Sequence, residues 1–218
     1  EDLDFAIPMH VDAGRAERSR AADAIKRAVA DVTRRLPFFS CQTKLIGAND
    51  SAQYNGAITY RSVVSGDQES ILIDVSVREP VLLPPAMLPA RTVLLDPIGG
   101  QPAVSDVKVA CITALEALAE KFRAALSQRD VAIRDFYDID YASRHLAMNL
   151  ASPAFIDLVR RKLAIPENPP VDVGEERMIA LQRQEAAKLK TVLRQKEFQD
   201  FELDRAIALV REMAAQLA

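Results

Sequence analysis

The segment EKFRAALSQRDVAIRDFYDIDYA, residues 120–142, combines helical spacing of apolar residues with a dense set of charges. Lys121 lies on a predicted helix with a long apolar stripe, and Arg134, Asp135 and Asp138 follow on the next predicted helix. Asp135 and Asp138 are three residues apart, so they share a helical face. Two interpretations are open: salt bridges that join two helices, or a charged site that binds a substrate.

The chain on either side of this segment changes character near residue 105. Before it, ILIDVSVREP at 71–80 predicts a strong strand, and residues 15–36 predict one helix that Pro37 ends. After it, helical patterns dominate, beginning with one helix over 105–126 that Ser105 or Asp106 would cap. We therefore predict an α/β (α+β) fold with a mixed sheet over 1–104 and a C-terminal helical bundle over 105–218.

Composition narrows the class of protein. The net charge of −3 over 218 residues is not that of a bulk polycation for nucleic acid, and no apolar run is long enough to span a membrane. Cys41 and Cys111 lack metal-site spacing, which favours a reduced cytoplasmic protein. His10 and His145 lie in no motif, so we expect neither to be catalytic.

Three further carboxylates lie in predicted strands. Asp2 and Asp4 are two residues apart, so in a strand both point to the same face, as ligands of Mg²⁺ would. Asp74 lies in the middle of the apolar strand, where a carboxylate is costly to bury without a partner. The alternatives are that Asp2 and Asp4 are solvated terminal residues and that Asp74 lies on the wet face of an antiparallel sheet with Leu72 and Ser76.

Three segments, in this order along the chain, resemble the motifs of the AbiEii/AbiGii-type nucleotidyltransferase toxin family. They are EDLDF (1–5), LIDVS (72–76) and EKFRA…RDFYD (120–138). The resemblance covers most of residues 1–150. It implies a nucleotidyltransferase-like fold and transfer of a nucleoside monophosphate from an NTP to an RNA acceptor, often a tRNA end. It also implies a cognate antitoxin as a protein partner.

The resemblance assigns a role to each charged residue. Asp2, Asp4 and Asp74 would bind Mg²⁺, or Asp74 would accept the proton of the attacking hydroxyl. Lys121 would bind triphosphate oxygens, with Asp135 and Asp138 orienting it or meeting the base or ribose. Arg134 would pair with these carboxylates or contact the acceptor. Further candidate acceptor contacts are the basic helix 15–35 and Arg160, Arg161 and Lys162.

One departure from the family pattern concerns glycine. A Gly-rich loop, which holds the nucleotide phosphates through backbone N–H groups, precedes EDLDF in the family and is absent from residues 1–218. Gly99 and Gly100 follow the third carboxylate and are no substitute. We therefore expect a polypeptide that begins at Glu1 to be inactive. Two alternatives stay open: a non-catalytic interaction module of the same fold, and a metal-dependent phosphoesterase, whose sites usually also recruit histidines.

Overall fold

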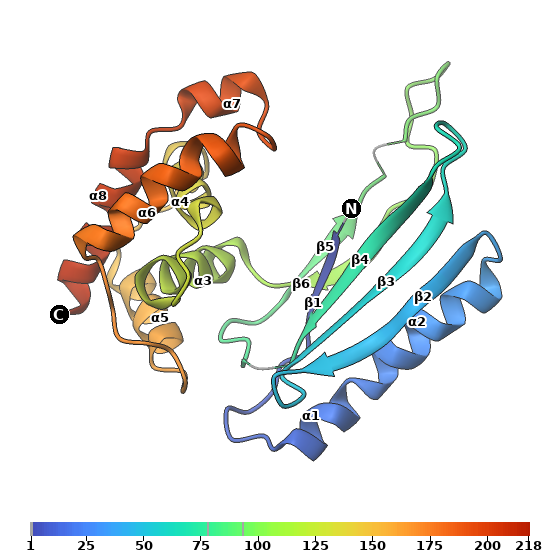
Figure 1. Ribbon diagram of the computed structural model, residues 1–218, viewed down its shortest axis with the longest axis horizontal. Helices are drawn as coiled ribbons and strands as arrows, with labels where there is room; N and C mark the ends of the chain where they lie inside the picture. The colour runs from blue at the N-terminus through green and yellow to red at the C-terminus, as the bar shows by residue number, and fades with distance from the viewer. Residues whose placement is uncertain (1, 78, 93) are drawn as a thin grey trace. The chain divides into compact units, whose positions relative to one another are not determined.

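The computed structural model of the chain describes residues 2–77, 79–92 and 94–218, which form two compact units, Glu1–Val81 and Leu82–Ala218 (Figure 1). The division falls earlier than the domain boundary predicted between residues 104 and 105. Residues 82–104 belong with the helical unit because Leu82 and Leu83 pack against its core and because strand β5 pairs with β6.

The first unit is a four-stranded sheet with two helices. Its elements are β1 (Asp2–Ala6), α1 (Arg15–Ala21), α2 (Asp23–Arg35), β2 (Phe39–Ala48), β3 (Gln53–Arg61) and β4 (Gln68–Ser76). Helix α2 runs alongside β2 and β3 (Figure 1). Its Val29 is buried in one apolar cluster with Tyr54, Ile58, Ile73 and Val75, so one face of the sheet forms this core.

The strand order is β1-β4-β3-β2, with β1 parallel to β4 and the other pairs antiparallel. The sheet is therefore mixed, as predicted. The predicted strand 71–77 is the greater part of β4. The single helix predicted over 15–36 is wrong: α1 and α2 are separated at the buried Ala22, whose ψ of −9° departs from the helical value near −42°.

The second unit is a two-stranded ribbon followed by helices. Its elements are β5 (Ala86–Ala90), β6 (Val107–Cys111), α3 (Ala114–Ser127), α4 (Ile133–His145), α5 (Pro153–Leu163), α6 (Glu175–Gln184), the π-helical turn η1 (Glu185–Leu189), α7 (Gln195–Asp200) and α8 (Leu203–Leu217). Fully buried side chains such as Phe122 on α3, Phe136 on α4 and Phe155 on α5 form its core. Together with the mixed sheet, this helical unit confirms the predicted α+β class.

The prediction of a helix that begins at Ser105 or Asp106 is wrong. Residues 107–111 instead form strand β6, because the alternating Val107 and Val109 pair with Ala90 and Leu88 of β5. Helix α3 begins after Thr113, whose hydroxyl accepts a hydrogen bond from the Glu116 N–H at 3.2 Å. Among the described residues, no helix is long and apolar enough to cross a membrane.

Candidate functional site

The strand carboxylates of the first unit share one face of its sheet. Asp4 of β1 lies directly beside Asp74 of β4 in the parallel register, and Asp2 lies beside Leu72. Because side chains alternate along a strand, Asp2, Asp4 and Asp74 point away from the face that carries the buried Ile73 and Val75. Neighbouring strands are about 4.8 Å apart, so the pairing brings two carboxylate-bearing backbones as close as a sheet allows.

Two amides of β3 extend this row of carboxylates, and sequence reasoning missed both. The Gln53 Nε2 donates a hydrogen bond to the Asp74 carboxylate at 2.7 Å. Asn55 lies opposite Asp74 in the antiparallel register of β3 and β4. The signal that could have identified them is the two-residue alternation of QYNGAITY, in which Gln53 and Asn55 fall on the face opposite Tyr54 and Ile58.

The donor set of Asp2, Asp4 and Asp74 fits Mg²⁺ in kind, because this hard cation prefers carboxylate oxygens. Within the described part of the chain, no three or more His, Cys, Asp or Glu side chains are gathered closely enough to hold an ion by themselves. Mg²⁺ is usually bound through one or two carboxylates together with substrate phosphates and water, not by an all-protein cage. The row therefore fits an ion that arrives with a nucleotide.

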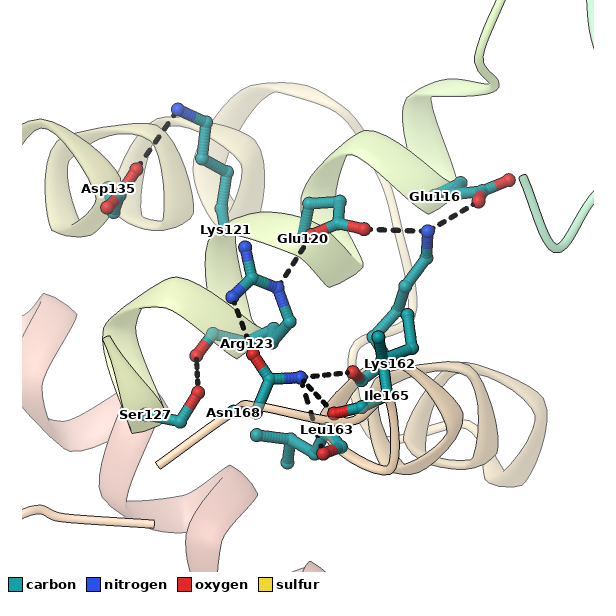
Figure 2. A network of polar contacts seen from close by, with 10 residues as sticks. All are labelled: Glu116, Glu120, Lys121, Arg123, Ser127, Asp135, Lys162, Leu163, Ile165 and Asn168. Carbon is teal, nitrogen blue, oxygen red and sulfur yellow. Dashed lines mark hydrogen bonds and ion pairs between the residues drawn. The ribbon is translucent and has the colours of Figure 1, made fainter. Parts of the chain in front are cut away.

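The second unit brings together Lys121, Asp135 and Asp138. The Lys121 Nζ lies 3.0 Å from the Asp135 Oδ1 and 3.0 Å from the Asp138 Oδ2, which links α3 to α4. Figure 2 shows Lys121 and Asp135 pointing toward each other from their two helices. The Lys121 side chain is 40% exposed. Because an ammonium group carries three N–H donors, these pairs leave one for another acceptor.

Burial and charge act in opposite directions on this cluster. Partial burial lowers the pKa of Lys121, but the negative charges of Asp135 and Asp138 outweigh it and raise the pKa above its ordinary value. The pKa of Asp135 is also raised, because burial of its carboxyl outweighs the neighbouring ammonium. Burial has the largest effect on Asp135 because only 12% of its side chain is exposed.

Arg134 does not join this cluster. It is exposed on α4 and lines a cavity of about 390 Å³ with Gln184, Lys188 and Thr191. The structure shows no ion pair from Arg134 to Asp138 among the described residues. Its position is open to solvent, as a contact to another molecule requires.

The position of Lys162 contradicts its prediction as an acceptor contact. Proposed as a surface contact for an acceptor, it is instead only 3% exposed, and its Nζ lies 2.7 Å from the Glu116 Oε1 and 2.6 Å from the Glu120 Oε1. Figure 2 shows it reaching from α5 between these two carboxylates of α3. The apolar stripe of α5 places Lys162 one turn after Leu158 on the buried side, whereas Arg160 and Arg161 are exposed.

The Glu116 carboxylate also anchors the start of the second unit. It accepts hydrogen bonds from the N–H groups of Leu82 at 2.7 Å and Leu83 at 2.9 Å. Burial raises the pKa of Glu116. The hydrogen bonds from Lys162 and from these backbone N–H groups lower the pKa by more than burial raises it, so it lies below its ordinary value. Glu116 and Lys162 are therefore structural.

Asp140 is a second structural carboxylate that sequence reasoning missed. Its side chain is fully buried and pairs with Arg144 at 2.8 Å and Arg205 at 2.5 Å, which ties α4 to α8. It lies two residues beyond Asp138, in the same acidic run. Its partner Arg205 comes from a distant helix, so spacing alone could not separate its role from that of Asp138.

The basic residues of α1 and α2 divide into two groups. Arg18 pairs with Asp50 at 3.2 Å, and the Lys26 Nζ lies 4.5 Å from the centre of the Tyr54 ring. These residues hold the helices to the sheet. Arg20, Arg27 and Arg35 are exposed and lie outside every ion pair that the described residues form. Only this second group is free to meet phosphates.

A mixed sheet that carries carboxylates on its open face, followed by a helical unit, defines a nucleotidyltransferase-like α+β protein. A family model described as "Nucleotidyl transferase AbiEii toxin, Type IV TA system" matches residues 1–215. The chain therefore belongs to the AbiEii nucleotidyltransferase toxins of type IV toxin–antitoxin systems, which confirms the resemblance of its motifs.

One solved structure agrees at the level of the fold. The Helicobacter pylori protein JHP933 is similar over 100% of this chain and 75% of its own, with a TM-score of 0.50 and 12% identity. A second H. pylori protein, described as a candidate nucleotidyltransferase, covers 100% of this chain and 77% of its own, with a TM-score of 0.47 and 13% identity. Among curated proteins, none matches the chain.

Proposed function

We propose that this protein transfers a nucleoside monophosphate from an NTP to an RNA acceptor, with a tRNA end as the first candidate. An acceptor hydroxyl attacks the α-phosphorus, the bond to the β-phosphate breaks, and pyrophosphate leaves. The observation that carries the proposal is the pairing of Asp4 with Asp74 on the open face of a mixed sheet. Family membership supports the reaction type.

The carboxylates of the first unit would supply the ligands for a metal. Asp2, Asp4 and Asp74 would hold Mg²⁺, which would neutralise charge that develops on the transferring phosphoryl group. Asp74 can alternatively accept the proton of the attacking hydroxyl. Gln53 fixes the Asp74 side chain through its 2.7 Å hydrogen bond.

Within the cluster, the Lys121 ammonium would supply one positive charge for the triphosphate. Asp135 and Asp138 hold the ammonium at 3.0 Å each and keep it protonated. Its third N–H remains for a phosphate oxygen. We assign Arg134 and the exposed Arg160 and Arg161 to contacts with the acceptor, because all three face solvent on the second unit.

We further propose that the protein acts in the cytoplasm and is held in check by a cognate antitoxin, as type IV toxin–antitoxin membership suggests. Cys41 and Cys111 are both free, which fits a reducing compartment. The alternative function is a non-catalytic interaction module of the same fold. The observation in its favour is that, in the described chain, the acidic side chains are not gathered into a ready metal cluster.

The test is transfer of labelled nucleotide to total tRNA by the full-length protein, with each of the four NTPs and with Mg²⁺ or EDTA. We expect Mg²⁺-dependent labelling that Asp74→Asn lowers by at least about a hundredfold, because it removes a ligand or the base. Asp12→Asn is the matched control: Asp12 is an exposed carboxylate of the same unit and makes only a 3.3 Å pair with the exposed His10.

The outcomes separate the two functions. Equal activity of Asp74→Asn and wild type would remove Asp74 from the reaction. No labelling by the wild type with any NTP, despite a cooperative unfolding transition, would favour the interaction module.

A further inference from the structure

A cavity lies at one corner of the first unit, away from the row of carboxylates. It has a volume of about 570 Å³ and is lined by residues 37–40, 59–61 and 66–68. These residues come from the end of the α2–β2 connection, the end of β3 and the β3–β4 turn. The residues at this corner are an unusual combination of an exposed aromatic ring, hydroxyl groups and cations.

The exposed ring is that of Phe38, which is 66% accessible to solvent. It is held in place from one side by Phe39, with ring centroids 4.5 Å apart, and Phe39 in turn meets Tyr60 edge-on at 5.8 Å. Since 66% of the Phe38 side chain is exposed, its packing on Phe39 covers only part of the ring. A fixed ring with one open face is the surface on which an unpaired nucleic-acid base stacks.

One cation lines the cavity together with this ring, and two more precede the corner in the chain. Arg61 lines the cavity, and its Nε donates a hydrogen bond to the Gly66 carbonyl at 2.9 Å, which fixes the guanidinium at the rim. Arg34 and Arg35 form the last turn of α2, just before the corner. Arg34 pairs with Asp31, which leaves Arg35 unpaired among the described residues, and the cavity lining itself carries one charge of each sign, Arg61 and Asp67.

The corner also reaches the face of the sheet that carries Asp74. Gln68, which lines the cavity, is separated from Asp74 along β4 by six residues, or about 20 Å at 3.3 Å per residue. Since the interval is even, both side chains lie on the same face. A strand bound at the corner can therefore continue along this face toward the carboxylates.

We infer that the corner formed by Phe38, Tyr60 and Arg61 binds an unpaired base of the acceptor RNA, a few nucleotides from the reacting hydroxyl. Phe38 supplies the stacking surface, and Arg35 and Arg61 meet the flanking phosphates. The inference rests on the proposed RNA acceptor and adds where that acceptor is held. A single-stranded nucleic acid is favoured over an apolar protein segment because Arg61 and the hydroxyl groups of Ser40, Thr59 and Tyr60 line the cavity with the exposed ring.

The test uses the full-length protein and a fluorescein-labelled, mixed-sequence single-stranded RNA octamer, with binding followed by fluorescence anisotropy at a fixed salt concentration. We expect Phe38→Ala to weaken binding roughly 5- to 100-fold, the effect of losing one base–aromatic stack, and Phe38→Tyr to restore it. Ile46→Ala is the matched control, since Ile46 is an apolar side chain of β2, 62% exposed and outside the cavity. Thermal unfolding of each variant checks the fold, which truncation of so exposed a ring should preserve.

The transfer assay run in parallel separates this inference from the proposed function. Asp74→Asn should bind the octamer as the wild type does while losing transfer. Wild-type binding by Phe38→Ala, equal losses in Phe38→Ala and Ile46→Ala, or no binding by the wild type would each overturn the stacking site. Binding that depends on Phe38 without any transfer would support the stacking site and overturn the proposed transfer activity.

Discussion

Lys121 and Lys162 show how one motif serves two purposes in the second unit. Each ammonium lies between two carboxylates at 3.0 Å or less. The Lys121 side chain is 40% exposed, whereas that of Lys162 is 3% exposed. A buried ion pair that loses one partner leaves a charge without compensation, whereas an exposed pair contributes little.

We therefore expect Lys162→Met to lower the free energy of unfolding by about 3–5 kcal/mol. Lys121→Met should lower it by less, because Lys121 and Asp138 are 40% and 42% exposed, although Asp135, which is 12% exposed, loses its cation. Urea denaturation followed by circular dichroism measures both. Lys121→Met should in addition lose nucleotide transfer by the full-length protein. Comparable destabilisation by the two substitutions would make both lysines structural and would remove Lys121 from the proposed site.

Asp140 provides a second prediction at this scale. Asp140→Ala leaves Arg144 and Arg205 without their shared carboxylate and should destabilise the protein by about 3 kcal/mol. Asp157→Ala, on the exposed side of α5, is the control and should change the free energy of unfolding by less than about 0.5 kcal/mol. The same denaturation experiment compares them, and equal midpoints would show that Asp140 carries no structural role.

The joint between α3 and α5 makes stability depend on pH. The pKa values of Glu116 and Glu120 are both lowered: burial raises them, but Lys162 and further hydrogen-bond donors outweigh burial. A carboxyl with a lowered pKa in the folded state stabilises it above the unfolded value of about 4.3 and loses that contribution as pH falls through the folded value. The second unit should therefore lose stability in acid.

The measurement is urea denaturation at a series of pH values between about 6 and 3. Glu116→Gln should flatten the decline in unfolding free energy below about pH 4.3. Asp135→Asn is a control of opposite sign, because the pKa of Asp135 is raised in the folded state and its contribution is lost as pH rises. Its removal should steepen the increase in stability above about pH 4. Identical pH profiles for Glu116→Gln and wild type would contradict the assignment.

Helices and strands that their own residues favour could be predicted from the sequence. Those that form only by pairing with, or packing against, another segment could not. The apolar run of β4 and the caps of the later helices specify their own structure, for example Ser152 and Pro153 at the start of α5. Residues 107–111 have alternating valines within a segment rich in helix formers, and only pairing with β5 makes them a strand. The break at Ala22 likewise follows from burial against the sheet.

Prediction of the candidate site from the sequence has the same limit. The sequence identified Asp2, Asp4, Asp74, Lys121 and Asp138 as candidates because they fall in motifs. It could not assign Lys162 to the interior, since the two carboxylates that pair with it lie on another helix. It also could not identify Gln53 and Asn55, which take their places beside Asp74 only through the register of β3.

At the scale of the whole molecule, the boundary between the two compact units can be tested directly. A fragment of residues 82–218 contains the whole helical core together with Leu82 and Leu83. We expect it to fold alone and to unfold cooperatively. A fragment of residues 105–218, cut at the boundary predicted from sequence, loses the two backbone donors of Glu116 and should be less stable by about 2 kcal/mol.

Circular dichroism and urea denaturation of the two fragments make the comparison. A third fragment, residues 82–218 with Glu116→Gln, shows how much of the difference depends on the carboxylate. Equal stability of the first two fragments would mean that residues 82–104 contribute nothing to the helical unit.

The parallel pairing of β1 with β4 has a consequence for how the candidate site forms. Asp4 is made early and Asp74 much later, and the strands that lie between them in sequence do not separate them in the sheet. Contacts between such distant parts of a chain carry a large loop-closure cost and tend to form slowly. A nascent chain that has not yet added β4 lacks Asp74, one of the three proposed metal ligands. Under the proposed function, the site therefore stays incomplete until β4 has been added and has paired with β1.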